Sequence, residues 1–534
     1  MGRFGACLPI LVVTAGLIAC DTGANPHVRR RDPGSLVVAQ ATGPLKLDPV
    51  RVTDNESIEI GGLLFEGLVR WKPGTTDIRP GLATAWEVHD NGTRWRFRLR
   101  PGVQFHDGSD FDADAVVFSF ERLLDPAHPQ ALGDDGRYWR SLMRPVTKVA
   151  AVDPYTVDIT VSRPYAPLLG NLAMFAIVSP MAVRRWGDAF KEHPAGTGPF
   201  QFESWSKGEH LILRRFERYW GTSAVLERIV FRVVVDARQR LIELESGSVD
   251  LATSILPDEQ AFVELHPELV LHHTPGNDVS YLAFNMARRG PNSFADQRVR
   301  RAVAHAINKE PIVKLAYQGR AVAADGPLPP TQWGYHRPKQ RYGFDPARAR
   351  QLLDEAVKAR AFDRDVTYKL YALSTPRPYL AQPERVARFI QAGLDQIGIK
   401  TELIMQGYSE HRASLERGEH DLALFGWIGD TGDPDNFLYV LFHSDNTGTT
   451  AQNLAFYRDP VVDKLLTDAQ AEVEEGARSR LYRSVQDKLA EDVPWVPIAH
   501  SEYVVAGRSE IQNVVLSPLG HPIYAAIHRT PEAR

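Results

Sequence analysis

The positions of the two cysteines constrain this 534-residue chain more than any other single feature. Both lie within the first 20 residues, so the rest of the chain can form neither an internal disulfide nor a cluster of thiolate metal ligands. The chain is also too long for one ordinary domain of about 100–200 residues. We therefore expect two or three packed units that are stabilised by the burial of apolar side chains.

Composition narrows the class of protein further. The chain is 43% hydrophobic and 24% charged, which is typical of a globular protein and excludes disordered, collagenous and multi-span membrane chains. The 62 basic and 66 acidic residues give a net charge of −4, and no domain-sized basic block occurs. A nucleic-acid partner is not expected, because it would require a positively charged surface.

The N-terminus has the pattern of a targeting segment. An apolar run from residue 4 to residue 19 is too short to span a bilayer comfortably, and it ends in Leu17-Ile18-Ala19-Cys20. This tetrapeptide resembles the bacterial lipoprotein box. The resemblance implies a signal peptide at 1–19, lipidation of Cys20 and a flexible spacer at 20–35. An ordinary secretory signal is the alternative.

Strand and helix signals alternate in the first half of the chain. Alternating or apolar runs predict strands at 36–39, 95–100 and 156–161, and Asn91-Gly92 predicts a hairpin turn. Apolar residues at three- and four-residue spacing predict helices at 112–124 and 296–315. The predicted fold class is therefore mixed α/β.

A second block, from about 284 to 499, repeats a strand–helix–strand order. Strands are predicted at 367–371, 400–404 and 421–425, with helices at 382–397 and 409–417 between them. This order predicts crossover connections in a parallel or mixed sheet. Ligands of such folds bind at the carboxyl ends of strands and between lobes.

Catalytic signatures are missing from the sequence. No phosphate-binding P-loop, zinc-protease H-E-x-x-H or G-x-S-x-G motif occurs. His272 and His273 are neighbours in a predicted strand and would point to opposite faces, so they do not form a metal site by themselves. Residues 105–108, Phe-His-Asp-Gly, are predicted to form a turn. We expect no enzymatic activity, no bound metal and no cofactor.

Several segments along the chain resemble the peptide/nickel family of extracytoplasmic solute-binding proteins that serve ABC importers. They lie at 79–88, 95–103, 105–108, 196–200, 219–221, 281–285 and 299–303. The resemblance implies a two-lobed α/β clamp with an extra subdomain in the first lobe. Lobe I is expected at 36–283 with the subdomain at about 68–190, lobe II at 284–500, and a return to lobe I at 501–534.

Two smaller expectations accompany this fold. The glycines of Gly196-Thr197-Gly198 are expected to form a turn. Four tryptophans in or between the matching segments are expected to pack in the core or on a lobe surface rather than stack on a ligand. They are Trp86, Trp95, Trp205 and Trp220.

Residues 426–437 are similar to a segment of the family's dipeptide-binding members, in which the first aspartate receives the α-ammonium of the peptide. The resemblance assigns that role to Asp430. Its position after the apolar run 422–428 suits the carboxyl end of a strand. Asp433 and Asp435 stand beside Gly432 and Pro434, which favours loop-capping turns for them.

Arg377, in Thr375-Pro376-Arg377-Pro378-Tyr379, is similar to the arginine that receives the carboxylate of the ligand in the same relatives. A guanidinium binds a carboxylate through two parallel hydrogen bonds. A solvated surface arginine is the alternative. Tyr379, Tyr408 and Trp427 align with aromatic positions near the ligand and either line side-chain pockets or only pack.

Two opposite charges held about 7 Å apart would select ligands by length. An extended residue spans about 3.3–3.6 Å, so such a pair fits a zwitterionic dipeptide and misplaces one terminus of a tripeptide. Backbone contacts and water-filled side-chain pockets would leave the amino-acid sequence of the ligand free.

These observations together predict a lipid-anchored, monomeric receptor that captures short peptides and delivers them to an ABC permease. It would act on the periplasmic side of the cytoplasmic membrane, or on the cell surface where no outer membrane exists. Alternative ligands within the family are oligopeptides, glutathione, haem and nickel chelates. A secreted peptidase and a chaperone-like protein are the alternatives from other classes.

Overall fold

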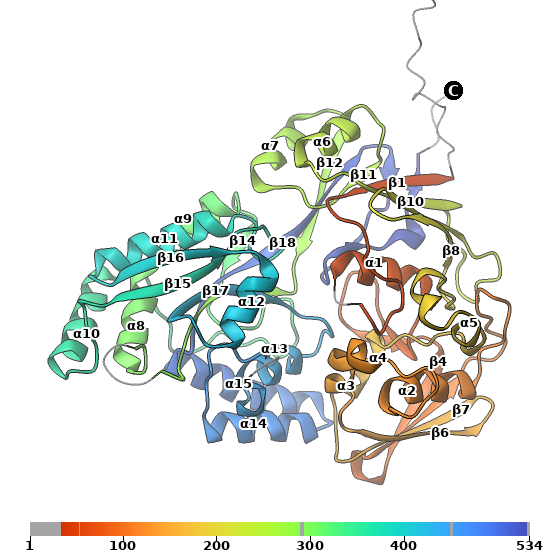
Figure 1. Cartoon of the computed structure of the whole chain (residues 1–534), viewed down its shortest axis with the longest axis horizontal. Helices are drawn as coiled ribbons and strands as arrows, with labels where there is room; N and C mark the ends of the chain where they lie inside the picture. Colours follow the sequence, from red (N-terminus) through yellow and green to blue (C-terminus); the bar gives the residue numbers. More distant parts are fainter. Residues whose placement is uncertain (1–33, 53, 289–292, 449–451, 531–534) are drawn as a thin grey trace, which may run out of the picture. The chain divides into compact units, whose positions relative to one another are not determined.

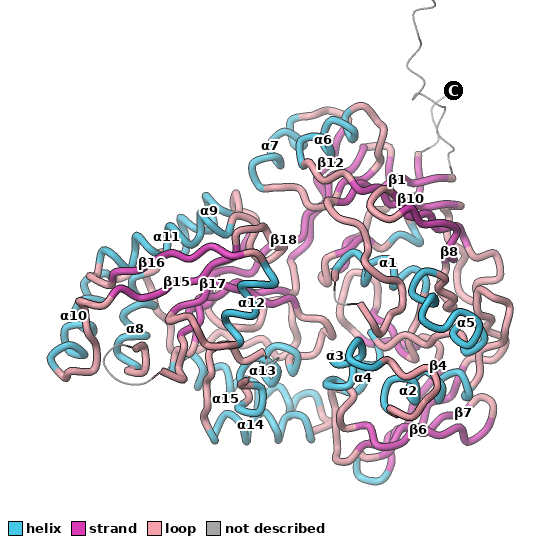
Figure 2. Tube along the Cα trace, in the orientation of Figure 1, coloured by secondary structure: helices cyan, strands magenta, loops and turns pink. Residues whose placement is uncertain are grey.

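A computed structural model describes residues 34–52, 54–288, 293–448 and 452–530. The predicted signal peptide, the lipidation of Cys20 and nearly all of the spacer lie outside these described residues. In the described part of the chain, no helix has the length and apolar character needed to cross a membrane. Strands and helices are interspersed throughout the described residues, so the fold is mixed α/β as predicted (Figure 2).

The largest element is a mixed sheet that contains twelve strands of the described residues, ten of them in the order β16-β15-β17-β13-β18-β11-β1-β10-β9-β8. Strands β12 and β14 pair with β18 beside this path. The strands are β1 (Ser35–Gln40), β8 (Phe200–Ser206), β9 (His210–Arg215), β10 (Arg228–Val233), β11 (Leu251–Ala252), β12 (Leu269–Pro275), β13 (Asp278–Phe284), β14 (Ala321–Ala323), β15 (Thr367–Leu373), β16 (Lys400–Gln406), β17 (Leu422–Ile428) and β18 (Trp495–Arg508).

Strand β18 joins the two halves of this sheet. Its first residues, 495–499, pair with β13, and its last residues, 502–508, pair with β12. Figure 1 shows β18 running from the group of β15, β16 and β17 to the group of β1, β10 and β11. The predicted lobe boundary at residue 500 therefore falls inside one continuous strand, and the division into lobes stays a prediction.

A separate antiparallel sheet has the order β4-β5-β7-β6, with α2 packed against β6 and β7. Its strands are β4 (Ala83–His89), β5 (Arg94–Leu99), β6 (Val146–Asp153) and β7 (Thr156–Val161). The hairpin predicted at Asn91-Gly92 joins β4 to β5, and both residues have a left-handed backbone with φ of 53° and 87°. Asp112 caps α2 by accepting a hydrogen bond from the Ala115 amide.

The α-helices of the described residues mostly cover the faces of these sheets (Figure 1). They are α1 (Asn55–Leu64), α2 (Ala113–Leu124), α3 (Arg137–Leu142), α4 (Leu168–Met174), α5 (Pro180–Trp186), α6 (Ala237–Glu245), α7 (Pro257–Leu265), α8 (Gln297–Ala306), α9 (Lys309–Ala316), α10 (Pro346–Lys358), α11 (Pro383–Gln396), α12 (Tyr408–Glu416), α13 (Asp435–Phe442), α14 (Pro460–Ala471) and α15 (Glu475–Asp492).

The single helix predicted at 296–315 is wrong, because the segment forms α8 and α9 with a break at Ile307 and Asn308. Pro311 explains the break. In a continuous helix its ring would clash with the carbonyl group of Ile307, four residues earlier, and it has no N–H to donate to that carbonyl. The structure places Pro311 in the first turn of α9, where no such partner is needed.

The chain bends at residues 197–199, as expected for the segment of Gly196 and Gly198. A Cβ atom on Gly196 would lie 2.2 Å from the Leu64 carbonyl oxygen, and one on Gly198 would lie 2.3 Å from the Leu63 carbonyl oxygen. These glycines are therefore required by the close approach of the end of α1. The turn at 105–108 is confirmed, since the Gly108 amide donates to the Phe105 carbonyl over 2.9 Å.

The four tryptophans behave as packing residues. Trp95 is buried in the core that the four-stranded sheet shares with α2, and Trp86 and Trp220 pack against the same core. Trp205 packs against the core under β8, β9 and β10. The indole N–H of Trp220 donates to the Glu66 carboxylate over 2.7 Å.

Candidate functional site

The five predicted ligand-binding residues lie on or after three neighbouring parallel strands. Strand β15 pairs in parallel with β16 on one side and with β17 on the other, so the three carboxyl ends meet at one edge of the sheet. Arg377 and Tyr379 follow β15, Tyr408 follows β16, Trp427 lies in β17, and Asp430 follows β17. The edge is the place where ligands bind to sheets of this type.

Arg377 lies in a tight turn after β15. The Leu380 amide donates to the Arg377 carbonyl over 2.8 Å, and the Arg377 amide donates to the Leu380 carbonyl over 3.1 Å. The half-buried guanidinium stacks on the ring of Tyr408, 3.8 Å from its centroid. Arg377 is thus held by a cation–π contact, and it does not extend freely into solvent.

Tyr379 and Tyr408 pack around one residue of β17. Both rings lie 6.1 Å from the ring of Phe425, Tyr379 edge-on and Tyr408 stacked. Tyr379 is only 6% exposed, and a Cβ atom on Gly426 would lie 2.2 Å from its ring. Burial raises the pKa of Tyr379 far above its ordinary value. Tyr379 acts as a packing residue in this structure, and Tyr408 supports the guanidinium.

The Asp430 loop is organised by Asn436, which the sequence did not single out. The side-chain oxygen of Asn436 accepts from the Asp430 amide over 3.0 Å and from the Trp427 indole N–H over 2.9 Å. Asn436 lies in the first turn of α13, so the helix fixes the loop that precedes it. The segment similar to the family contains Asn436, but nothing in the local pattern indicates its role.

The Asp430 carboxylate has a partner from a distant part of the chain. The hydroxyl of Tyr138, in α3, donates to Asp430 Oδ2. Burial raises the pKa of Asp430 to about 6, while the hydrogen bonds of Tyr138 and Asn436 lower it. The Trp71 indole also donates to the Thr431 carbonyl over 3.4 Å. No local sequence pattern pointed to Tyr138, because 292 residues separate it from Asp430.

Asp433 and Asp435 have different roles, although the sequence predicted the same loop-capping role for both. Asp433 accepts from the Asp435 amide over 2.9 Å, which confirms its turn-capping role. It also forms a buried, bidentate ion pair with Arg478 at 2.8 and 2.9 Å. The loop-capping role expected for Asp435 is wrong, because its carboxyl is buried and accepts from Gln470 at 3.1 Å. Burial, with Asp433 adding to it, raises the pKa of Asp435 to about 7.

Neither Arg377 nor Asp430 is neutralised within the part of the chain that the structure describes. The described residues include no carboxylate within ion-pair distance of Arg377 and no cationic side chain within that distance of Asp430. The edge of the sheet therefore offers one cationic and one anionic group, each set among aromatic side chains. Such a pair is suited to a small molecule that carries both charges.

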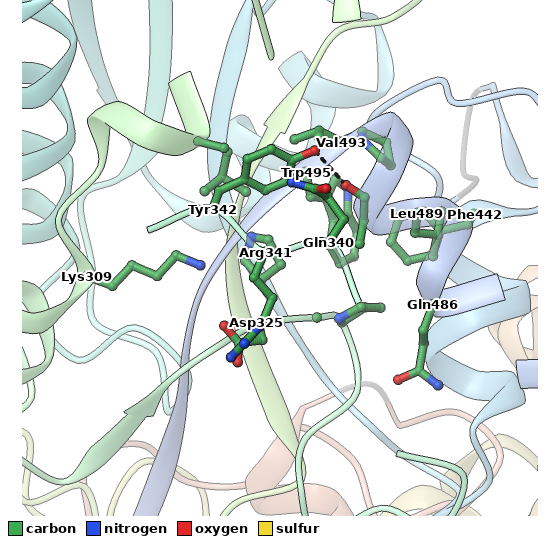
Figure 3. A pocket seen from close by; sticks show the side chains of 17 residues that line it. Lys309, Asp325, Gln340, Arg341, Tyr342, Phe442, Gln486, Leu489, Val493 and Trp495 are labelled. Carbon is green, nitrogen blue, oxygen red and sulfur yellow. Dashed lines mark hydrogen bonds between the residues drawn. The ribbon is translucent and has the colours of Figure 1, made fainter. Parts of the chain in front are cut away.

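A cavity elsewhere does not contain the predicted residues. It is lined by α15, β18 and the segments around Lys309, Asp325 and Tyr342 (Figure 3). Two of its charged side chains are already bonded within the chain: Lys309 donates to the Ala324 carbonyl at 2.6 Å, and Asp325 accepts from Arg337 at 2.7 Å. We therefore place the candidate site at the sheet edge.

The fold and the pair of unneutralised charges define a solute-binding protein. A family model described as bacterial extracellular solute-binding proteins, family 5 middle, matches residues 77–449. The chain belongs to this family. It is accordingly a binding protein and not an enzyme, as the sequence predicted.

Relatives with curated names bind different ligands. The chain is 32% identical to heme-binding protein A of Haemophilus influenzae, over 98% of this chain and 99% of the relative. It is also 32% identical to the dipeptide-binding protein of Escherichia coli, over 96% of each chain.

Among solved structures, the chain matches the ABC transporter-associated periplasmic binding protein DppA of Helicobacter pylori in complex with the peptide STSA. The TM-score is 0.81 at 32% identity, covering 93% of this chain and 98% of the other. The predicted periplasmic-binding-protein fold is thereby confirmed.

Proposed function

We propose that this protein is the substrate-binding lipoprotein of an ABC importer and that it captures dipeptides by their charged termini. Asp430 receives the α-ammonium group, Arg377 receives the α-carboxylate, and the loaded protein delivers the ligand to a membrane permease. The observation that carries the proposal is the pair of opposite, unneutralised charges at the carboxyl ends of parallel strands. The dipeptide-binding relative supports the same ligand class.

The proposal includes a closing movement of two lobes. In it, lobe I (36–283, with the subdomain at about 68–190, and 501–534) and lobe II (284–500) come together over the ligand. The hydrogen bond from Tyr138 to Asp430 joins residues of the two proposed lobes, so in this proposal closure brings Tyr138 to the ligand site. A ligand that bridges the lobes would favour the closed form, which the permease would recognise. Anchoring through Cys20 would keep the receptor beside its permease.

Calorimetry with blocked peptides tests the ligand assignment. The purified protein, freed of bound ligand by mild denaturation and refolding, is titrated with Ala-Phe, N-acetyl-Ala-Phe, Ala-Phe-amide and Ala-Ala-Phe. We expect tight binding of free Ala-Phe alone. Equal binding of the acetylated and the free peptide would contradict the role of Asp430.

Substitutions connect each terminus to its receptor. Asp430→Asn should weaken binding of Ala-Phe by about 2–5 kcal/mol, because the ligand ammonium then lacks its counter-charge. Acetylation should cost no further affinity in this variant, since the two changes remove the same interaction. Arg377→Ala should abolish the effect of amidation in the same way. Arg388→Ala, on the exposed face of α11, is the matched control and should bind as the parent does.

Haem is the second candidate ligand, because heme-binding protein A is similar over nearly the whole chain. Titration with haem, followed by its absorption spectrum, distinguishes the two. A Soret shift at stoichiometric haem that Ala-Phe does not reverse would favour haem over the dipeptide.

A further inference from the structure

The start of β13 contacts the loop that carries Asp430. The Gly429 amide donates to the Asn277 carbonyl over 2.7 Å, and the Asn277 side-chain amide donates back to the Gly429 carbonyl over 2.9 Å. A Cβ atom on Gly429 would lie 2.3 Å from the ring of Phe437 and 2.5 Å from the Asn277 amide nitrogen. Asn277 itself is 1% exposed. The residue before Asp430 is therefore clamped to the residue before β13.

The turn that carries Arg377 is attached to the same place. The Ser501 hydroxyl lies 3.1 Å from the Pro378 carbonyl oxygen, and the Tyr317 hydroxyl donates to the Tyr379 carbonyl over 2.9 Å. Both hydroxyl groups are buried. Two consecutive carbonyl groups next to Arg377 are thus held by side chains from outside the turn.

Those two hydroxyl groups are in turn anchored on β13. The Ser501 amide donates to the Asp278 carboxyl over 2.8 Å, and the Ser501 hydroxyl also contacts that carboxyl. The Tyr317 hydroxyl lies 3.0 Å from the Ser280 hydroxyl. Residues 277, 278 and 280 therefore connect to both proposed receptors for peptide termini.

The Ser501 hydroxyl has one hydrogen and two acceptors, Asp278 and Pro378. Both contacts are satisfied when the Asp278 carboxyl keeps its proton and donates to Ser501, which leaves the hydroxyl free to donate to Pro378. Burial raises the pKa of Asp278 to about 7, which supports the protonated form. The titratable side chains beside it, Tyr317 and His500, are both uncharged, since burial lowers the pKa of His500 to about 4.

We propose that Asn277, Ser501 and Tyr317 are positioning residues that fix the separation of Arg377 and Asp430 and thereby select the length of the ligand. This inference rests on the proposed function of those two charges. A third residue in the ligand adds about 3.3–3.6 Å, so the site can reject it only if neither receptor moves. The contacts to β13 supply that rigidity, because they hold the backbone next to each receptor.

Two single-atom deletions test the proposal. Ser501→Ala and Tyr317→Phe each remove one hydroxyl group and do not change the identity of Arg377 or Asp430. They are made singly and as a double variant. The affinities of Ala-Phe and Ala-Ala-Phe are measured by calorimetry on the full protein. In the double variant the preference for the dipeptide should fall by about fivefold or more, since each lost hydrogen bond is worth roughly a factor of five.

Tyr368→Phe is the matched control. The Tyr368 hydroxyl donates to the Asp363 carbonyl over 2.8 Å from the other end of β15, and Tyr368 is buried in the same core as Tyr317. This control should lose a similar amount of thermal stability and keep the parent's preference for the dipeptide. The readout therefore separates positioning from general destabilisation.

Asn277→Ala provides an independent variant if the double variant does not fold, and it should also reduce the preference. An unchanged preference in both variants overturns the inference, as does a parent protein that binds the two peptides equally. If Asp430→Asn and Arg377→Ala still weaken binding as predicted above in that case, the proposed function stands without the inference. If these two substitutions leave binding unchanged, the proposed function fails, and the inference that rests on it fails as well.

Discussion

Acidification should weaken peptide binding through Asp430. Burial raises the pKa of this carboxyl to about 6, although the Tyr138 hydroxyl and Asn436 partly offset the effect. A ligand ammonium is attracted by the ionised carboxylate and gains nothing from the protonated form. The affinity for a dipeptide should therefore fall as the pH drops through 6.

The expected size of the change in affinity follows from the pKa of Asp430. At pH 7.5 nearly all Asp430 carboxyls are ionised, whereas at pH 5 roughly one in ten is ionised. The dissociation constant of Ala-Phe should rise about tenfold, or about 1.4 kcal/mol, between these two values. The ligand contributes less than about twofold, because its α-ammonium titrates at about 7.7–8.0 and is still mostly protonated at pH 7.5, and its α-carboxylate titrates at about 3.3–3.7.

Calorimetric titrations at pH 5, 6, 7 and 7.5 measure the effect, with thermal unfolding at each pH to confirm that the protein stays folded. Asp430→Asn should bind more weakly and show a nearly flat profile. Tyr138→Phe should shift the midpoint to higher pH, because the hydroxyl that lowers the pKa of Asp430 is lost. A parent protein with a flat profile, or an Asp430→Asn variant with the full tenfold change, would refute the reasoning.

Two further predictions concern the support of the site. Arg478→Ala should lower the free energy of unfolding by about 3–5 kcal/mol, because it leaves the buried Asp433 carboxylate unpaired. The control is Arg480→Ala, at an exposed position of the same helix, which should change the free energy of unfolding by less than about 0.5 kcal/mol. Urea unfolding of both variants measures the difference. Gly426→Ala should weaken dipeptide binding more than tenfold, because its Cβ would lie 2.2 Å from the Tyr379 ring and would displace the turn that carries Arg377. In the same titration, the control Gly407→Ala should bind as the parent does, because its Cβ would meet nothing within 4 Å.

Local patterns predicted the elements well wherever the chain has a strong period. The strand at 156–161, the helix capped by Asp112 and the turn at Asn91-Gly92 all occur as expected. The prediction of a single helix at 296–315 failed for a local reason, the proline at 311, because the spacing of apolar residues continues across the break. The need for glycine at positions 196 and 198 has a distant cause, because the end of α1 lies against them.

The predictions for the candidate site show the same contrast between local patterns and distant contacts. The residues quoted in the similar segments, Asp430 and Arg377 among them, lie at the ends of parallel strands, as a strand–helix–strand order requires. Tyr138 and Asn436 were missed, since a hydrogen-bond partner is chosen by position in space.

The sequence by itself determined the α/β class, the family and the two charges that we propose hold the ligand, because these depend on local periods and on residue identity. Only the tertiary structure decided which groups surround those charges. Asp430 has a raised pKa and a tyrosine partner because α3 packs beside its loop, and Arg377 rests on Tyr408 because β15 and β16 are neighbours. Desolvation and hydrogen bonding act over a few ångströms in space, whatever the distance along the chain.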